Sequence, residues 1–231
     1  MKRIFLLISG IALSLGVNSQ VTFEAQGKGG MASTWLFNKN ISDQGAEQDY
    51  AMAWGSSYGV GINLYYKNIG IGIEGLASKH TGGYAGDLGV LGKYSAHSTL
   101  KGYQIPVLLK LKSEGGVYLE LGVQANGVSN ATYTIDYTDS DIFDGSSDET
   151  VNYSKNYMSA VLGFGANVKL SQKIPLGLLF GVRLNYGFAD AKGVDALGVN
   201  LDNSILYSTY EKTNAASGAI MLGLTYGFEL K

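Results

Sequence analysis

The feature that most constrains this chain is an alternation of large apolar residues with glycine and polar residues. It runs through residues 60–66 (VGINLYY) and 117–126 (VYLELGVQAN), among other segments. Because successive side chains of a β-strand point to opposite faces, a period of two predicts strands. A water-facing strand surface gains nothing from glycine, whereas a crowded polar interior needs room for long charged side chains. The pattern therefore predicts a barrel with a polar interior and an apolar exterior, as in barrels that span a membrane.

Residues 1–19 have the composition of a secretory signal peptide. Lys2 and Arg3 precede an apolar core, and small residues follow it as at a signal-peptidase cleavage site, so we expect cleavage after Ser19. Residues 20–231 are then expected to form one outer-membrane β-barrel domain. Removing the signal leaves 15 basic and 19 acidic residues, a net charge of −4. No basic stripe remains, which disfavours nucleic acid as a partner.

Composition supports the membrane interpretation. The chain is 45% hydrophobic and 16% charged, with 33 glycines and 16 tyrosines. After the signal, no run of about 18 apolar residues could form a spanning helix. The chain has no cysteine, which excludes disulfides, thiol chemistry, thiolate metal sites and a lipid-anchoring cysteine.

The fold class expected is all-β, an eight-stranded antiparallel up-and-down transmembrane β-barrel. Tight turns are predicted at 67–69, 113–116 and 171–175, and long loops at 38–51, 81–96, 134–153 and 190–214. Short periplasmic turns alternating with long extracellular loops are typical of outer-membrane barrels, and an even strand number puts both termini on the periplasmic side. Pro106 predicts a bulge, since it donates no ladder hydrogen bond. The strands are expected near 21–37, 52–66, 70–80, 97–112, 117–133, 154–170, 176–189 and 215–230.

Aromatic residues gather near the ends of these strands. Amphipathic rings at both rims are typical of the interfacial girdles of membrane barrels, although ordinary strand aromatics are an alternative. The candidates are Trp35, Phe37, Trp54, Tyr66, Tyr153, Tyr157, Tyr186, Phe188, Tyr226 and Phe228.

With the apolar set facing lipid, six charged residues face the interior and form a candidate charge network. An eight-stranded barrel is just wide enough for side chains to fill it. Unpaired charges there are costly, so the acids Glu74 and Glu120 are expected to meet bases. The network is interpreted as a structural plug, with a gated path for small solutes as the alternative; which acid meets which base stays open. Its members are Glu24, Lys28, Glu74, Lys110, Glu120 and Arg183.

No catalytic or metal site is expected, and no cofactor. The segment 139–145 resembles a calcium loop, but its spacing is one residue too long and the distal glutamate is missing. A solvated acidic loop is the preferred interpretation. His80 and His97 could approach each other at the outer rim beside Ser98 and Asp87, yet nothing in their spacing requires a catalytic set.

Three segments carry a resemblance to a known family. Residues 103–110 (YQIPVLLK), 118–122 (YLELG) and 186–190 (YGFAD) are similar to the PorT-like small outer-membrane β-barrel proteins of Bacteroidetes. Gln104 stands where that family often has glutamate, and Phe188 where it has leucine. The resemblance implies an outer-membrane barrel, and one member class supports a protein-secretion system. Separately, residues 223–228 resemble the C-terminal signal read by the outer-membrane insertion machinery.

The expected location is the outer membrane of a Gram-negative bacterium, and the expected role is structural or interactive rather than enzymatic. The expected partners are outer-membrane lipid and lipopolysaccharide, the insertion machinery during assembly, and a possible protein partner at the extracellular loops. The alternatives are an accessory component of a protein-secretion system or a narrow small-solute pore. A rim enzyme ranks below these. A soluble secreted barrel with an apolar pocket requires the opposite assignment of faces.

Overall fold

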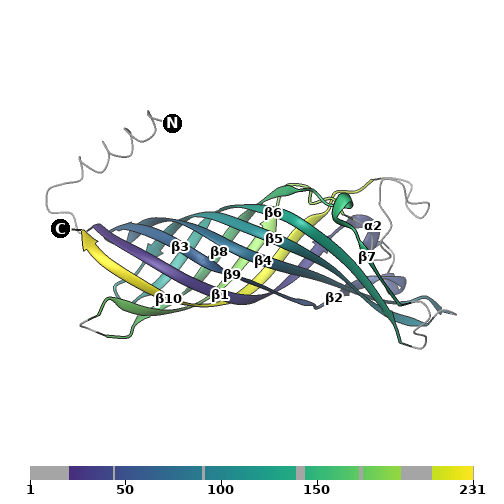
Figure 1. Ribbon diagram of the computed structural model, residues 1–231, viewed down its shortest axis with the longest axis horizontal. Coiled ribbons are helices and arrows are strands. Elements are labelled where there is room, and N and C mark those ends of the chain that lie inside the picture. Colours follow the sequence, from purple (N-terminus) through teal and green to yellow (C-terminus); the bar gives the residue numbers. More distant parts are fainter. Residues whose placement is uncertain are drawn as a thin grey trace.

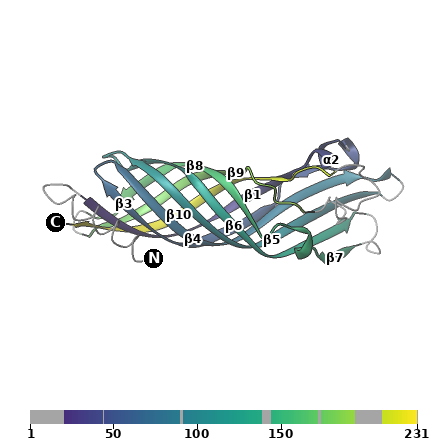
Figure 2. The same cartoon turned by 90° about the horizontal axis from the view of Figure 1, so that it is seen from above.

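The chain forms a closed, single-sheet β-barrel. The computed structural model describes residues 21–43, 45–89, 92–138, 144–171, 174–193 and 210–230. Within them, ten strands form one sheet, and all but β2 and β7 close into a ring because β1 pairs with both β3 and β10 (Figures 1 and 2). The predicted eight-stranded antiparallel up-and-down barrel is confirmed. The predicted signal peptide lies outside the described residues.

Each ring strand is antiparallel to both of its neighbours in the ring. Val21 pairs with Leu230, so the ring begins and ends on one side, which we call the turn end because the short turns lie there (Figure 1). The opposite side is the loop end. The ring strands are β1 (Val21–Phe37), β3 (Trp54–Tyr66), β4 (Ile69–Asp87), β5 (Lys93–Lys112), β6 (Val117–Tyr137), β8 (Asn156–Lys169), β9 (Leu176–Gly187) and β10 (Asn214–Leu230).

The outer face of the ring is apolar and the inner face is polar. Val60 is 69% exposed and Ile71 is 62% exposed, whereas Glu74 and Gln124 are buried. Because the side chains alternate between the two faces, the apolar set forms a continuous outer belt. A belt of this kind suits contact with lipid rather than water. No helix of the described residues is long and apolar enough to span a membrane.

The alternation reverses toward the loop end. On β5, the outward residues Tyr103 and Ile105 are apolar, but the next outward residue is Lys101. On the inner face of the same strand, Gln104 is followed by the buried apolar side chain of Leu100. The outer face is therefore polar and the inner face apolar beyond this level, as expected where strands leave lipid and enter water.

This reversal explains why the predicted long loop at 81–96 is wrong. β4 and β5 continue through most of that range, so that only residues 88–92 connect them. The inward rings of Tyr84, Tyr94 and Tyr133 pack with Ile41 in one buried cluster, and this packing holds the extended strands together.

Short elements cover the projecting strands. Ile41 belongs to the helix α2 (Lys39–Ser42), which is followed by the single turn η1 (Gly45–Glu47). β2 (Asp49–Ala51) pairs with β4, and β7 (Gly145–Asp148) pairs with β6 next to the turn η4 (Thr150–Asn152). Both edges of the projecting β4–β5–β6 hairpins are thus paired, which blunts edge-to-edge aggregation.

Two further predictions about the strands are wrong. The β4–β5 register is the same on both sides of Pro106, and the bulge lies instead where Lys101 pairs with Asn130 and Gly102 with Val128. Among the predicted girdle aromatics, Tyr153 and Tyr157 are buried in a cluster at the loop end rather than facing outward.

Candidate functional site

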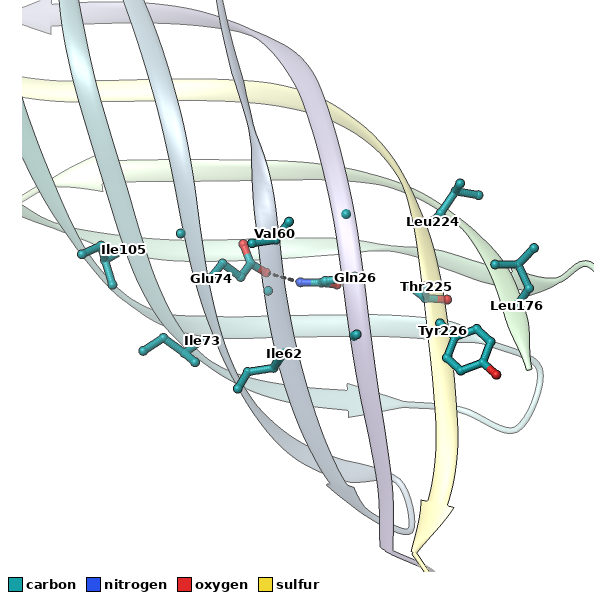
Figure 3. A pocket seen from close by; sticks show the side chains of 14 residues that line it. Gln26, Val60, Ile62, Ile73, Glu74, Ile105, Leu176, Leu224, Thr225 and Tyr226 are labelled. Atoms are coloured by element: carbon teal, nitrogen blue, oxygen red, sulfur yellow. Dashed lines mark hydrogen bonds between the residues drawn. The ribbon is translucent and has the colours of Figure 1, made fainter. Parts of the chain in front are cut away.

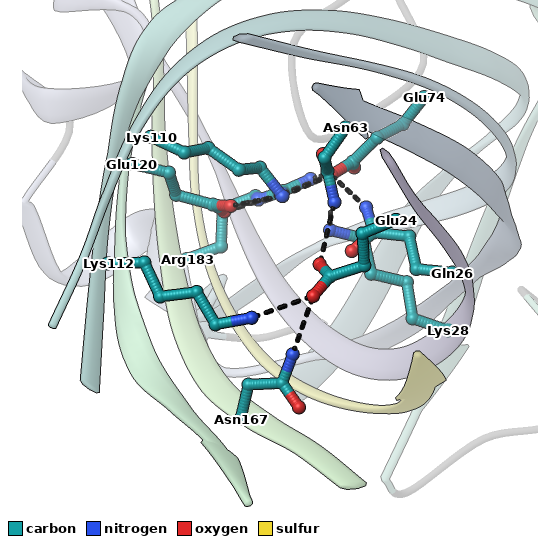
Figure 4. Close-up of polar contacts among 10 residues, drawn as sticks. All are labelled: Glu24, Gln26, Lys28, Asn63, Glu74, Lys110, Lys112, Glu120, Asn167 and Arg183. Carbon is teal, nitrogen blue, oxygen red and sulfur yellow. Dashed lines mark hydrogen bonds and ion pairs between the residues drawn. The ribbon is translucent and has the colours of Figure 1, made fainter. Parts of the chain in front are cut away.

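Five charged side chains meet inside the barrel and form what we call the central cluster (Figure 4). They come from β1, β4, β5, β6 and β9, and each is at most 7% exposed. Every one belongs to the set predicted from the sequence to face the interior. The members are Lys28, Glu74, Lys110, Glu120 and Arg183.

Glu74 accepts hydrogen bonds from three directions. The Lys28 Nζ lies 2.6 Å from its Oε1, and the Gln26 amide donates to the same oxygen at 2.8 Å. Arg183 adds a two-pronged pair, with Nη1 donating to Oε2 at 2.8 Å and Nη2 to Oε1 at 3.1 Å. Bidentate arginine–carboxylate pairs of this kind are strong and geometrically specific.

Glu120 shares the same cations. Its Oε1 accepts from Arg183 Nε at 2.7 Å and from Nη2 at 2.5 Å. The Lys110 Nζ lies between the two carboxylates, 3.5 Å from Glu74 and 3.4 Å from Glu120. Three cations thus face two carboxylates, so the central cluster carries an excess of one positive charge.

Glycines on the inner wall leave the room that the central cluster occupies. A Cβ added at Gly163 would lie 2.4 Å from the Glu120 carboxylate, and one added at Gly61 would lie 2.8 Å from the Glu74 Cγ. Real Cβ atoms do not approach other atoms so closely. The mixture of glycine and charge in the sequence therefore reflects one packed interior.

Glu24, the sixth predicted residue, lies in a separate group nearer the turn end. Its carboxylate accepts from Asn63 at 3.0 Å, from Lys112 at 2.7 Å and from Asn167 at 3.1 Å. The sequence reasoning missed Lys112, although it lies two residues after Lys110 on one strand and therefore faces the same side. Below this group a vestibule of about 890 Å³, lined by both polar and apolar side chains, opens at the turn end.

On the loop side of the central cluster, the interior is polar but uncharged. His80 lies between Thr34, whose Oγ1 is 3.0 Å from Nδ1, and Gln104, whose Nε2 donates to the ring Nε2 at 2.7 Å. With Nε2 accepting, the ring proton resides on Nδ1 and points to Thr34. His80 is thus held as a neutral donor–acceptor bridge.

A cluster of apolar side chains lies in the interior at the loop end. The buried side chains of Leu36, Leu100, Tyr153 and Tyr157 pack together with three alanines. From the turn end to the loop end the interior is therefore a vestibule, a charged layer, a polar layer and an apolar layer.

The other sequence candidates do not assemble into a site. His80 is paired with Leu100 on the inner face, whereas His97 is paired with Gly83 three rungs further on and therefore faces outward. The predicted approach of the two histidines is wrong. Among the described residues, no group of three or more histidine or acidic side chains is arranged to hold a metal ion. Asp139 and Asp141 of the acidic loop lie outside the described residues.

Comparison with known proteins gives structural neighbours only. No family model matches the chain, and no curated protein matches its sequence. The PorT-like resemblance therefore stays a prediction. Structural neighbours are small outer-membrane β-barrels, with identities below those that establish a shared family.

Three of these neighbours illustrate the range. The Neisserial surface protein A is 14% identical, with a TM-score of 0.42 and coverage of 89% of this chain and 97% of its own. The attachment invasion locus protein Ail of Yersinia pestis, crystallised with a heparin analogue, is 11% identical, with a TM-score of 0.41 and coverages of 90% and 99%. The outer membrane protein OprG of Pseudomonas aeruginosa is 16% identical, with a TM-score of 0.37 and coverages of 92% and 98%.

Proposed function

We propose that this protein is an integral outer-membrane β-barrel whose interior is closed and whose role is structural or interactive, carried by its loop end. The observation that supports this proposal best is the central cluster, where Arg183 joins Glu74 and Glu120 across the interior. Breaking a buried ion pair costs about 3–5 kcal/mol, so an opening that parts these side chains is rare. A closed interior moves the function to the surfaces that meet lipid and the outside.

The apolar belt supports the membrane location. Side chains such as Val60, Ile71 and Phe180 are half exposed or more, and a soluble protein of this size rarely presents so large an apolar surface. The lipid partners are outer-membrane lipid and lipopolysaccharide. The C-terminal residues 223–228 are the segment that the insertion machinery would read during assembly.

The loop end supports the interactive role because its segments are anchored. Asn38 donates to the Glu211 carbonyl at 2.8 Å and to Thr213 at 3.1 Å, which ties the first loop to the segment that leads into the strand β10. The Tyr50 hydroxyl donates to the Asn38 carbonyl at 3.1 Å and accepts from its N–H at 2.8 Å. A preorganised surface of this kind loses less entropy when a protein partner binds.

Extraction and gel migration test the location. We expect the protein to leave native membranes only with detergent and to migrate faster on a gel before heating than after it. A protein released by salt or found free in solution contradicts the proposal.

Planar-bilayer recording tests the closed interior. We expect the wild type to be silent and Arg183→Ala, which removes four hydrogen bonds to Glu74 and Glu120, to show intermittent conductance. Glu114→Gln in an exposed turn is the control and should stay silent. A wild type with steady single-channel conductance supports the alternative, a narrow solute pore, which the open vestibule and the positive excess of the central cluster favour.

The role as an accessory of a protein-secretion system rests on the PorT-like resemblance alone. A deletion strain tests it: loss of exported cargo, restored by the wild-type gene, favours this role, and unchanged export removes it. The residues that carry the resemblance, such as Pro106 and Leu119, build strands. A secretion role therefore needs this independent test.

A further inference from the structure

Two lysines stand directly opposite each other on the outer face of the barrel. Lys79 on β4 pairs with Lys101 on β5, and both side chains are exposed. Among the described residues, neither forms an ion pair. Like charges directly opposite in a ladder destabilise a sheet unless something neutralises them. Their neighbours in the same row, Ser56 and Asn130, are uncharged, so this row of the described sheet supplies no counter-ion.

The two lysines mark the upper edge of the apolar belt. The row just below them contains Tyr58, Ala77 and Tyr103, paired across three strands. Tyr58 is 66% exposed and Tyr103 is 48% exposed, as expected for rings at a membrane interface. The ammonium groups therefore lie at the level of the lipid headgroups.

Below this edge the belt is hollowed. Gly75 on β4 lies in a groove between Val60 on β3 and Ile105 on β5. Ile73, two residues before Gly75 on β4, bounds this groove toward the turn end (Figure 3). A Cβ built on Gly75 would meet no atom within 4 Å, so the floor of the groove is open. The outward series on β4 then reads Gly75, Ala77, Lys79, so only the small side chain of Ala77 lies between the floor of the groove and the lysine pair on this strand.

We propose that Lys79, Lys101 and the groove over Gly75 and Ala77 bind a phosphorylated lipid of the outer leaflet. An acyl chain lies in the groove between the β3 and β5 ridges, and a phosphate of the headgroup lies between the two ammonium groups. Lysine binds phosphate as a point charge, and two adjacent lysines without carboxylate partners suit a multiply charged anion. This inference rests on the proposed membrane location and adds to it a defined lipid site.

Native mass spectrometry of the full-length protein released from vesicles tests the site. The vesicles contain phosphatidylcholine with or without diphosphoryl lipid A. We expect the wild type to retain one lipid A, and K79Q/K101Q to retain it about tenfold less, because each lysine near a charged membrane surface contributes appreciably to binding. The matched control K67Q/K169Q removes two exposed lysines at the turn end and should retain lipid A like the wild type. Equal retention by K79Q/K101Q overturns the proposal.

Two further experiments distinguish the contribution of the groove from that of the lysine charges, and binding of a lipid from binding of a free anion. G75L keeps both lysines but fills the groove, and we expect it to lose lipid A retention; A77L serves if G75L does not fold. Excess inorganic phosphate should fail to displace the lipid, and full displacement would show that a free anion is the ligand. Gel migration of each variant before heating is measured in parallel. A folded, membrane-inserted K79Q/K101Q with unchanged retention refutes only this site, whereas a wild type that does not insert refutes the proposed function.

Discussion

Arg183 and Glu74 face each other from opposite walls of the barrel, four strands apart whichever way the ring is followed, and their side chains form a two-pronged ion pair. The contact joins β9 to β4 independently of the ladder hydrogen bonds. It therefore links two opposite walls of the barrel through side chains. The same guanidinium also bonds Glu120 on β6, so three strands share one side chain.

We expect Glu74→Gln to destabilise the barrel strongly. The substitution keeps the shape but leaves Lys28, Lys110 and Arg183 with a single carboxylate. Removing one partner of a buried pair costs about 3–5 kcal/mol. Urea unfolding in detergent, followed by the heat-dependent gel shift, measures the loss. Glu114→Gln at an exposed turn is the control, and a change below about 1 kcal/mol, as for a surface pair, contradicts this account.

Asn38→Ala should loosen the loop end while leaving the barrel intact. The Asn38 side chain caps α2 by accepting from the Asn40 N–H at 2.9 Å and also donates to Glu211 and Thr213. Loss of the cap alone costs about 1 kcal/mol. Limited proteolysis of the folded protein should cut near residues 38–53 sooner than in the wild type. Unchanged cleavage there, with the barrel core protected in both proteins, counts against the anchoring role.

A pH titration tests the hydrogen bonds between Asp148 and Thr150, which lie in the connection between β6 and β8. The Thr150 hydroxyl donates to the Asp148 carboxylate at 2.6 Å and the Thr150 N–H does so at 2.9 Å, and these bonds lower the pKa of Asp148. A lowered pKa in the folded state means that this contribution is present above the unfolded pKa and is lost as the pH falls through the folded value. In a carboxyl-carbon NMR titration, Thr150→Val should raise the pKa of Asp148 toward the ordinary value. An unchanged midpoint contradicts the assignment.

The alternation of the sequence predicts the strands well where they cross lipid. The sequence predicts a strand at 21–37, and β1 spans Val21–Phe37. The prediction succeeds because the side chains there alternate between the lipid-facing outer face and the packed interior. The hairpin at 81–96 was missed because its pattern has the opposite phase, with Tyr84 and Tyr94 inside and polar residues outside. Beyond the lipid the period of two is unchanged, but the apolar residues face the interior and the polar residues face outward. Tyr153 and Tyr157 were misplaced for the same reason.

The interior charges could be predicted as a set but not as pairs. Parity along each strand identifies Glu74 and Arg183 as inward residues. Their contact depends on the twist and closure of the ring, since it joins strands that share no ladder. The same parity also identifies Lys112 as an inward residue. The grouping of Glu24 with Lys112 rather than with the central cluster depends on the stagger between strands, which the sequence does not specify.

The glycines of the inner and outer faces should respond oppositely to the same substitution. A Cβ at Gly163 would fall 2.4 Å from the Glu120 carboxylate and force it off Arg183, whereas a Cβ at Gly27 would meet nothing within 4 Å. We expect Gly163→Ala to cost about 2 kcal/mol or more, through strain and a weakened ion pair. Gly27→Ala should be neutral or stabilise by about 0.4–1 kcal/mol, because it reduces the entropy of the unfolded chain. The urea unfolding midpoints of both variants, measured in the same detergent, compare their effects on stability. Equal effects would contradict the view that the inner glycines make room for charged side chains.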